Sequence, residues 1–208
     1  MIKTLLVSYS PRFESNTKKL IDTFLNVASD YSHVTHLDLG KDTPPFLLAD
    51  NLNALVKRNL MGMELTEEEN VSVKGVDRLL QQLLDADRIV IAFPMYNFSL
   101  PAAVKAWIDA VIQDGKTFKM TEDGGYEGLC AGKRALVLMT TGGDYSLEPA
   151  KSMDYATPLI QGCLGFMGIS SHSISAYGLN QYEDRVEGIV SDAQQKIVDY
   201  ITSNVFWK

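Results

Sequence analysis

The chain has 208 residues, enough for a sizeable hydrophobic core, and its length predicts a single domain over residues 1–208. Hydrophobic residues make up 46% of the chain and charged residues 22%, as in ordinary globular proteins. The net charge of −7 argues against general nucleic-acid binding and against adhesion to an anionic membrane. It does not exclude small anionic ligands, which respond to local hydrogen-bond donors.

The two cysteines, Cys130 and Cys163, belong to no CxxC pair. A disulfide scaffold and a zinc site are therefore poor interpretations, and two buried thiols in a cytosolic protein are a better one. The first ten residues, MIKTLLVSYS, hold an apolar run too short for a signal peptide. No window reaches the length of a membrane span. We expect a cytoplasmic protein.

The first part of the chain predicts strands that alternate with amphipathic helices. The expected elements are a strand at Ile2–Val7, a loop at Ser8–Asn16, a helix at Thr17–Ala28 and a strand at His33–Leu39.

An insertion follows, which we expect to lie outside the central sheet. Pro44-Pro45 excludes a helix there, Ala49–Met61 has a helical pattern, and Thr66 is a candidate cap for a short acidic turn at Glu64–Asn70. A helix is then expected at Lys74–Asp85.

The most informative stretch runs from Arg88 to Ala110. Arg88–Phe93 is apolar without alternation, which predicts a strand covered on both faces and ended by Pro94. A loop at Met95–Phe98 should lead into a helix, with Ser99 as its cap and Pro101 in its first turn.

The remaining elements continue the alternation. They are a hairpin-like excursion at Asp114–Leu129, a strand at Lys133–Met139, a glycine-bearing loop at Thr140–Glu148, a helix at Tyr155–Met167, a strand at Ser170–Tyr177 and a helix at Tyr182–Val205.

Five strands that alternate with helices predict an α/β fold, because parallel strands need crossover connections. We expect a flavodoxin-like, doubly wound, five-stranded parallel sheet in the order 2-1-3-4-5, with helices on both faces. In that order the loops Ser8–Thr17, Pro94–Phe98 and Thr140–Asp144 follow neighbouring strands. They should converge at one edge of the sheet, where such folds bind ligands.

The first of these loops is a candidate phosphate site. Ser15, Asn16 and Thr17 open a helix whose free N–H groups and dipole favour an anion, while Ser10 can add a hydroxyl and Arg12 a charge. The loop has neither the GxxxxGK[ST] nor the GxGxxG pattern. Ordinary helix capping by Ser15 or Thr17 is the alternative.

The second loop offers a surface for a flat ring. Met95 and Phe98 can lie against the ring, Asn97 can reach heteroatoms at its edge, and Tyr96 can do either. The alternative is that Met95 and Phe98 belong to the core.

In the third loop, Gly142 and Gly143 follow Thr140 and Thr141, and they let backbone N–H groups approach a ligand closely. A plain turn is the alternative.

Other residues give no chemical site. The three histidines, His33, His36 and His172, lie away from the converging loops, so we expect no metal site. There is no GxSxG pattern and no Ser/His/Asp set with a supporting spacing.

The order of these segments resembles the FMN-dependent NADH azoreductase and NAD(P)H quinone oxidoreductase family. PMYNF followed by SLPAAVKAWIDAV resembles its flavin-contact loop and the next helix. GKTFKMTEDGGYEGLCAGKRALVLMTTGG resembles its excursion, fourth strand and second flavin loop, and LGFMGI fits before the last strand. The serine loop is similar to its phosphate loop.

The resemblance implies a flavodoxin-like homodimer with FMN near the dimer interface. It also implies ping-pong chemistry, in which NADH or NADPH reduces FMN and FMNH2 reduces a quinone or azo compound. Carried over by position, Ser10 and Ser15–Thr17 hold the FMN phosphate, Pro94–Phe98 contact the isoalloxazine, and Thr140–Gly143 contact its pyrimidine edge. No acid or base is needed, because the flavin carries the chemistry.

Two positions depart from the family pattern. Thr141 stands where many relatives have arginine, and Met120 stands where an aromatic residue is common. Two other functions stay open: a flavodoxin-type electron carrier, and a flavin-free binding module that kept the fold.

Overall fold

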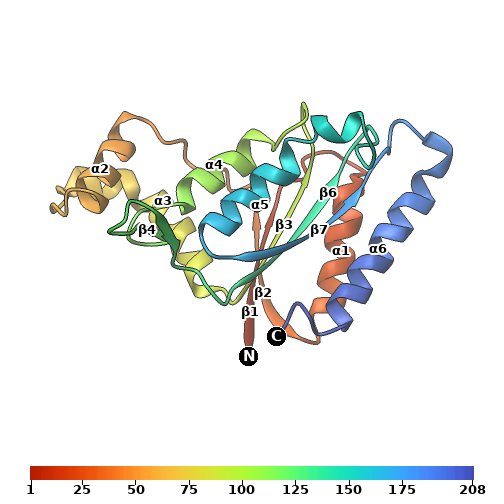
Figure 1. The fold of residues 1–208 in the computed structure, drawn as a ribbon, viewed down its shortest axis with the longest axis horizontal. Helices are drawn as coiled ribbons and strands as arrows, with labels where there is room; N and C mark the ends of the chain where they lie inside the picture. The colour runs from red at the N-terminus through yellow and green to blue at the C-terminus, as the bar shows by residue number, and fades with distance from the viewer.

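The computed structural model describes residues 1–208 and contains a five-stranded parallel sheet in the order β2-β1-β3-β6-β7 (Figure 1). Strands β4 and β5 form a separate two-stranded sheet, so β6 and β7 are the fourth and fifth strands of the central sheet. The observed order is therefore the predicted 2-1-3-4-5. The sheet strands are β1 (Ile2–Ser8), β2 (Ser32–Asp38), β3 (Arg88–Pro94), β6 (Arg134–Thr140) and β7 (Ser170–Ala176).

Helices cover both faces of the sheet. Successive residues of a strand point to opposite faces, so an apolar strand presents apolar side chains to the helices on each side. Ile89 and Ile91 of β3 pack in a cluster with α3 (Glu67–Asp85), α4 (Ala102–Val111) and α5 (Ala156–Phe166). Val90 packs in a second cluster with α1 (Asn16–Ala28) and α6 (Val186–Thr202). The uninterrupted apolar run of β3 follows from this burial on both sides.

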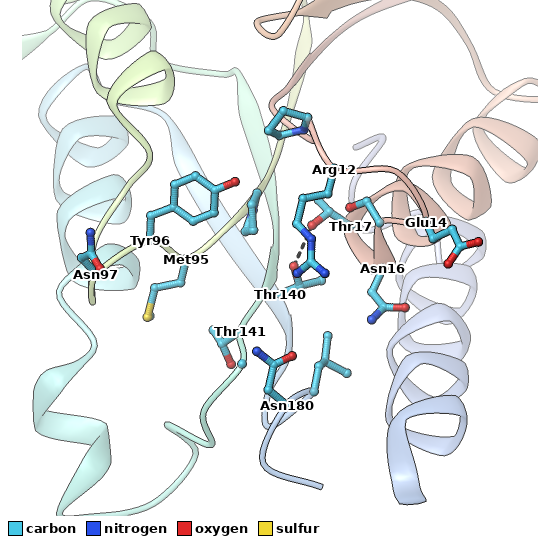
Figure 2. A pocket seen from close by; sticks show the side chains of 15 residues that line it. Arg12, Glu14, Asn16, Thr17, Met95, Tyr96, Asn97, Thr140, Thr141 and Asn180 are labelled. Carbon is cyan, nitrogen blue, oxygen red and sulfur yellow. Dashed lines mark hydrogen bonds between the residues drawn. The ribbon is translucent and has the colours of Figure 1, made fainter. Parts of the chain in front are cut away.

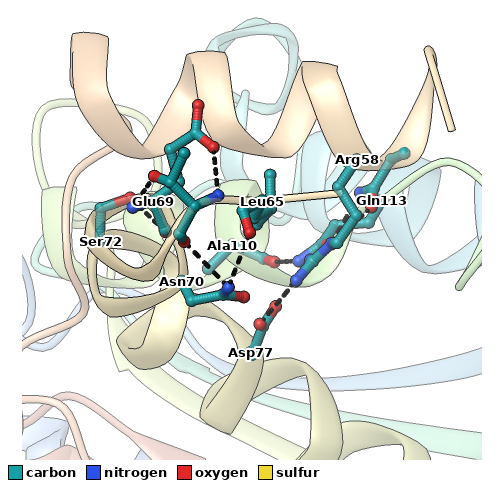
Figure 3. Close-up of polar contacts among 10 residues, drawn as sticks. Arg58, Leu65, Glu69, Asn70, Ser72, Asp77, Ala110 and Gln113 are labelled. Carbon is teal, nitrogen blue, oxygen red and sulfur yellow. Dashed lines mark hydrogen bonds and ion pairs between the residues drawn. The ribbon is translucent and has the colours of Figure 1, made fainter. Parts of the chain in front are cut away.

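Helix α2 (Ala49–Asn59) lies away from the sheet, beside α3, as expected for the insertion (Figure 1). Arg58 fixes it with two hydrogen bonds to the Asp77 carboxylate on α3, at 2.7 and 2.8 Å (Figure 3). Asn59 donates to Gln113 Oε1 at 3.0 Å, which ties the end of α2 to the segment after α4.

The start of α3 corrects one prediction. The helix begins at Glu67, well before Lys74, and has no separate short turn in front of it. Thr66 is a cap, as predicted, but it caps the whole of α3. Its Oγ1 accepts from the Glu69 N–H at 3.2 Å, and Glu69 Oε2 accepts from the Thr66 N–H at 2.7 Å.

The boundaries around β3 and α4 differ by a few residues from those expected. Pro94 is the last residue of β3 and pairs in register with Thr140, so the strand runs one residue further. Pro101, not Ser99, is the N-cap of α4. Ser99 instead exchanges two backbone hydrogen bonds with Tyr96, each 3.0 Å long, which closes the loop before the helix.

The predicted helix Tyr182–Val205 is too long at both ends. A 3-10 turn, η2 (Glu183–Arg185), precedes α6, and the helix ends at Thr202. The chain then folds back, and Arg88 holds the returning segment by donating to the carbonyls of Phe206 and Trp207. A second 3-10 turn, η1 (Ala150–Met153), was not predicted.

The predicted excursion is a two-stranded antiparallel hairpin of β4 (Phe118–Met120) and β5 (Tyr126–Gly128). Phe118 and Tyr126 pack against Phe166 of α5, with ring centroids 4.7 and 5.4 Å from it. None of the helices combines the length and the apolar character needed to cross a membrane.

Candidate functional site

The predicted loops meet at the carboxyl ends of β1, β3 and β6 and enclose a cleft of about 390 Å³ (Figure 2). This volume is in the range of small-molecule sites. The lining residues are Pro11, Arg12, Glu14, Ser15, Asn16, Thr17, Pro94, Met95, Tyr96, Asn97, Thr140, Thr141, Gly142, Leu179 and Asn180. Of the predicted residues, Ser10, Phe98 and Gly143 are not among them.

The first loop leaves backbone donors free at the start of α1. Ser15 occupies the N-cap position, but its side chain makes no capping hydrogen bond. Its Oγ instead accepts from Ser10 Oγ at 2.7 Å, which explains how Ser10 supports the loop from outside the cleft. No group of the chain accepts from the N–H of Asn16 or Thr17. The capping alternative is therefore not realised by Ser15, and the helix end can receive an anion.

Two charged side chains of the first loop border the cleft. Arg12 is the only cation among the lining residues, and it makes no hydrogen bond or ion pair within the chain. Figure 2 shows its guanidinium reaching into the cleft. Glu14 points outward in the same view and has a φ of +54°. The cleft thus carries a cation that is free to meet an anionic ligand.

The second loop is a tight turn. Asn97 and Phe98 have φ values of +47° and +68°, as in a type I′ turn, and the Tyr96–Ser99 backbone pair closes it. A bulky residue such as Phe98 is strained in this region, and such strain clusters at functional sites. The Asn97 amide has no partner within the chain and lines the cleft. Burial and the neighbouring Tyr9 raise the pKa of Tyr96, and Arg12 opposes this shift.

A smaller hollow of about 210 Å³ adjoins the cleft and contains Phe98. It shares Met95, Asn97, Thr141 and Gly142 with the cleft. Phe98 is 39% exposed and meets Tyr145 edge to face, with ring centroids 6.3 Å apart. The alternative that Phe98 belongs to the core is thus wrong, while Met95 does pack partly against the core.

Hydroxyl groups hold the third loop in place. Thr140 Oγ1 lies 2.6 Å from Thr17 Oγ1, which joins this loop to the start of α1. Thr141 Oγ1 donates to the Gly143 carbonyl at 2.6 Å. Gly142 lines the cleft and its N–H has no acceptor in the chain, whereas the Tyr145 ring covers Gly143 at 3.3 Å from its missing Cβ position.

A fourth loop, after β7, completes the cleft with Leu179 and Asn180, and sequence reasoning missed it. The predicted strand order contained the signal, since the last strand neighbours β6 and ends at the same edge. None of the three histidines lines the cleft. His36 instead contacts Ser8 Oγ through Nε2 at 2.8 Å. The hairpin residue Met120 is 63% exposed and also lies outside the cleft.

The arrangement fits a flat, phosphorylated ligand. Free N–H groups at the start of α1 supply the anion site, Met95 and Tyr96 supply an apolar wall, and Gly142 supplies a further N–H without an acceptor in the chain. The lining residues include no nucleophile paired with a base, an arrangement that suits chemistry carried by a bound group. These features suit an α/β protein that binds a phosphorylated, ring-bearing cofactor at the carboxyl edge of its sheet.

Comparison with known proteins gives the family. The sequence-family model described as a flavodoxin-like fold matches residues 2–201. An FMN-dependent NADH:quinone oxidoreductase 2 of Bacillus cereus is 37% identical over 203 residues, covering 95% of this chain and 97% of the relative. FMN-dependent NADH:quinone oxidoreductase 1 of Bacillus subtilis (strain 168) is 33% identical over 205 residues, covering 96% of this chain and 98% of the relative. The chain belongs to the flavodoxin-like family of FMN-dependent NADH:quinone oxidoreductases and azoreductases.

Solved structures agree with this. An azoreductase from Bacillus anthracis str. Sterne superposes with a TM-score of 0.90 at 32% identity, covering 98% of this chain and 100% of that chain. An FMN-dependent NADH-azoreductase from Bacillus anthracis str. Ames Ancestor, solved in complex with FMN, gives 0.84 at 25% identity, covering 98% and 99%.

Proposed function

We propose that this chain is an FMN-dependent oxidoreductase that transfers two electrons from NADH or NADPH to quinones, azo compounds or both. The relatives are named for FMN, NADH and quinone, and a similar structure was solved with FMN. The carrying observation is the cleft itself, which joins the free N–H groups at the start of α1 to a wall for a flat ring.

The residues present fit FMN. The N–H groups of Asn16 and Thr17 hold the phosphate, with Ser10 and Ser15 fixing the loop around it. Pro94 to Phe98 hold one side of the ring, and Thr140 to Gly143 hold its polar edge, with Gly143 acting through the loop conformation. Bound FMN supplies the hydride chemistry, and donor and acceptor use the site in turn, in a ping-pong sequence.

The protein contributes position and electrostatics. The strained turn at Asn97 and Phe98 fixes the backbone of Asn97 at the cleft, so only the side-chain rotamer of its unpartnered amide has to be ordered when the ring binds. The Gly142 N–H is held at the cleft edge by the hydroxyl contacts of Thr140 and Thr141, where it can stabilise negative charge on the ring. No side chain of the chain is required to move a proton.

A flavodoxin-type electron carrier is the main competing function. The α2 insertion and the hairpin β4–β5 argue for an enzyme, since a carrier needs neither. No residue of either element lines the cleft within one chain, so they would wall a substrate site only across the proposed dimer. Steady-state oxidation of NADH with a soluble quinone separates the two. An enzyme turns over many quinone molecules per flavin, and near-zero turnover by the FMN-loaded protein would favour the carrier.

We also propose that the protein is a homodimer and that it is located in the cytoplasm. Each chain would form one flavodoxin-like, doubly wound FMN-binding domain over residues 1–208. Large apolar side chains are exposed around α2, as expected for a surface covered by a second copy; they are Phe46, Leu48, Leu52, Leu60, Met61 and Met63. Hydrophobic clusters on both sheet faces support the doubly wound domain. The two free thiols, Cys130 and Cys163, support a reducing compartment.

A further inference from the structure

The loop after β7 is bound to the glycine loop along its backbone. Leu179 N–H donates to the Thr141 carbonyl at 3.0 Å, and Asn180 N–H donates to the Gly142 carbonyl at 2.9 Å. Gln181 N–H donates to the same Gly142 carbonyl at 3.0 Å, and Gly178 N–H to the Gly143 carbonyl at 2.9 Å. These four bonds fix the carbonyls of the glycine loop toward β7 and away from the cleft.

The same contacts place one side chain in the cleft. Asn180 Nδ2 lies only 2.8 Å from where a Cβ would stand on Gly142, so the absence of a side chain on Gly142 makes room for the amide. Figure 2 shows the amide beside Thr141, directed into the cleft. Neither its nitrogen nor its oxygen has a hydrogen-bond partner in the chain. The neighbouring amide of Gln181 is used differently, since it accepts from the Asp144 N–H at 2.8 Å and donates to Tyr182.

Resting on the proposed function, we infer that Asn180 is a cofactor-binding residue that donates its Nδ2–H to the polar edge of the flavin ring and thereby favours the reduced cofactor. The free N–H of Gly142 lies beside the Asn180 amide, and two adjacent donors suit an edge rich in acceptor atoms. The edge gains negative charge on reduction, so a hydrogen-bond donor at this edge binds the reduced form more strongly than the oxidised form.

The test uses the FMN-loaded protein with Asn180→Ala, Asn180→Asp and, as a matched control, Gln181→Ala. The readouts are the FMN dissociation constant and the two-electron midpoint potential. Asn180→Ala should weaken the reduced form about tenfold more than the oxidised form, which lowers the midpoint potential by about 30 mV for a two-electron couple. Asn180→Asp keeps the shape but places an acceptor-only carboxylate there, so its potential should fall further.

Gln181→Ala should leave the potential unchanged, because its side chain faces Asp144 and Tyr182. Unchanged potentials in both Asn180 variants would overturn the inference while the proposed function stands. A fall in Gln181→Ala equal to that in Asn180→Ala would also overturn it, since loosening of the loop would then be the cause. A wild-type protein that takes up no FMN would overturn the proposed function and this inference together.

Discussion

Asn97 combines the two properties that a ring-binding residue needs at this cleft. Its φ of +47° is one that asparagine tolerates better than most residues, and its amide is left without a partner in the chain. The position of Asn97 between Met95 and Phe98 in the sequence predicted that its amide contacts the edge of a flat ring. It did not predict the positive φ, because backbone conformation in a turn depends on the closing pair Tyr96–Ser99.

Asn97→Ala should therefore weaken FMN binding about tenfold, the effect of losing one hydrogen bond of about 1.4 kcal/mol. The FMN dissociation constant, measured by flavin fluorescence titration, checks this. Asn97→Gly is the matched variant, since glycine also lacks the amide but adopts a positive φ freely. Wild-type affinity in Asn97→Gly would show that the backbone, and not the amide, matters.

Residues of the first loop show a limit of sequence reasoning. Ser10 and Ser15 were grouped with Asn16 and Thr17 as phosphate ligands, but Ser10 donates to Ser15 and does not line the cleft. Serine hydroxyls bond to whichever acceptor the loop brings near, so the residue type gives the donor and not its direction. The free N–H groups at the start of a helix were easier to foresee, since every helix has them.

Among the elements, α3 shows where local signals were sufficient and where they were not. Thr66 and Glu69 form the reciprocal cap that the sequence indicated at Thr66. The first turn of α3 carries Glu67, Glu68 and Glu69 and no apolar residue, so the apolar pattern alone did not extend the helix back to its start and placed it at Lys74. Capping, more than apolar periodicity, marks the start of this helix.

Thr66→Ala should lower the free energy of unfolding by about 1 kcal/mol, because the Glu69 N–H loses its acceptor at the helix end. Urea unfolding followed by circular dichroism measures the change. Thr66→Ser keeps the hydroxyl and should remain near the wild type. Equal stability of Thr66→Ala and Thr66→Ser would contradict the capping role.

The C-terminal segment shows what no local pattern could give. The end of α6 was extended to Val205, but the chain turns back so that Phe206 and Trp207 are buried against the α1 face of the sheet. Arg88, more than a hundred residues earlier, holds this turn through the carbonyls of Phe206 and Trp207. Such a contact exists only after the sheet has formed.

On the scale of the whole molecule, the alternation of strands and helices predicted the parallel sheet. The order 2-1-3-4-5 was taken from the flavodoxin-like fold, and the convergence of three loops followed from that order. The fourth loop was missed because the residues Leu179 and Asn180 have no distinctive composition. Their role depends on backbone bonds to Thr141 and Gly142 across neighbouring strands.

The exposed apolar residues around α2 belong to the same scale. We expect a dimer in solution, because Phe46, Leu60 and Met61 would otherwise stay in water on an anchored helix and its flanks. Light scattering at micromolar concentration should give twice the chain mass of 23.0 kDa. A mass equal to that of one chain would refute the dimer.

The most direct test of the account is the visible spectrum of the purified protein loaded with FMN, recorded without oxygen before and after addition of NADH. An FMN-dependent NADH oxidoreductase should show a bound flavin band that remains with the protein through gel filtration and bleaches when NADH is added. A colourless protein that takes up no added FMN would contradict the account, and so would a flavin band that NADH and NADPH both leave unchanged.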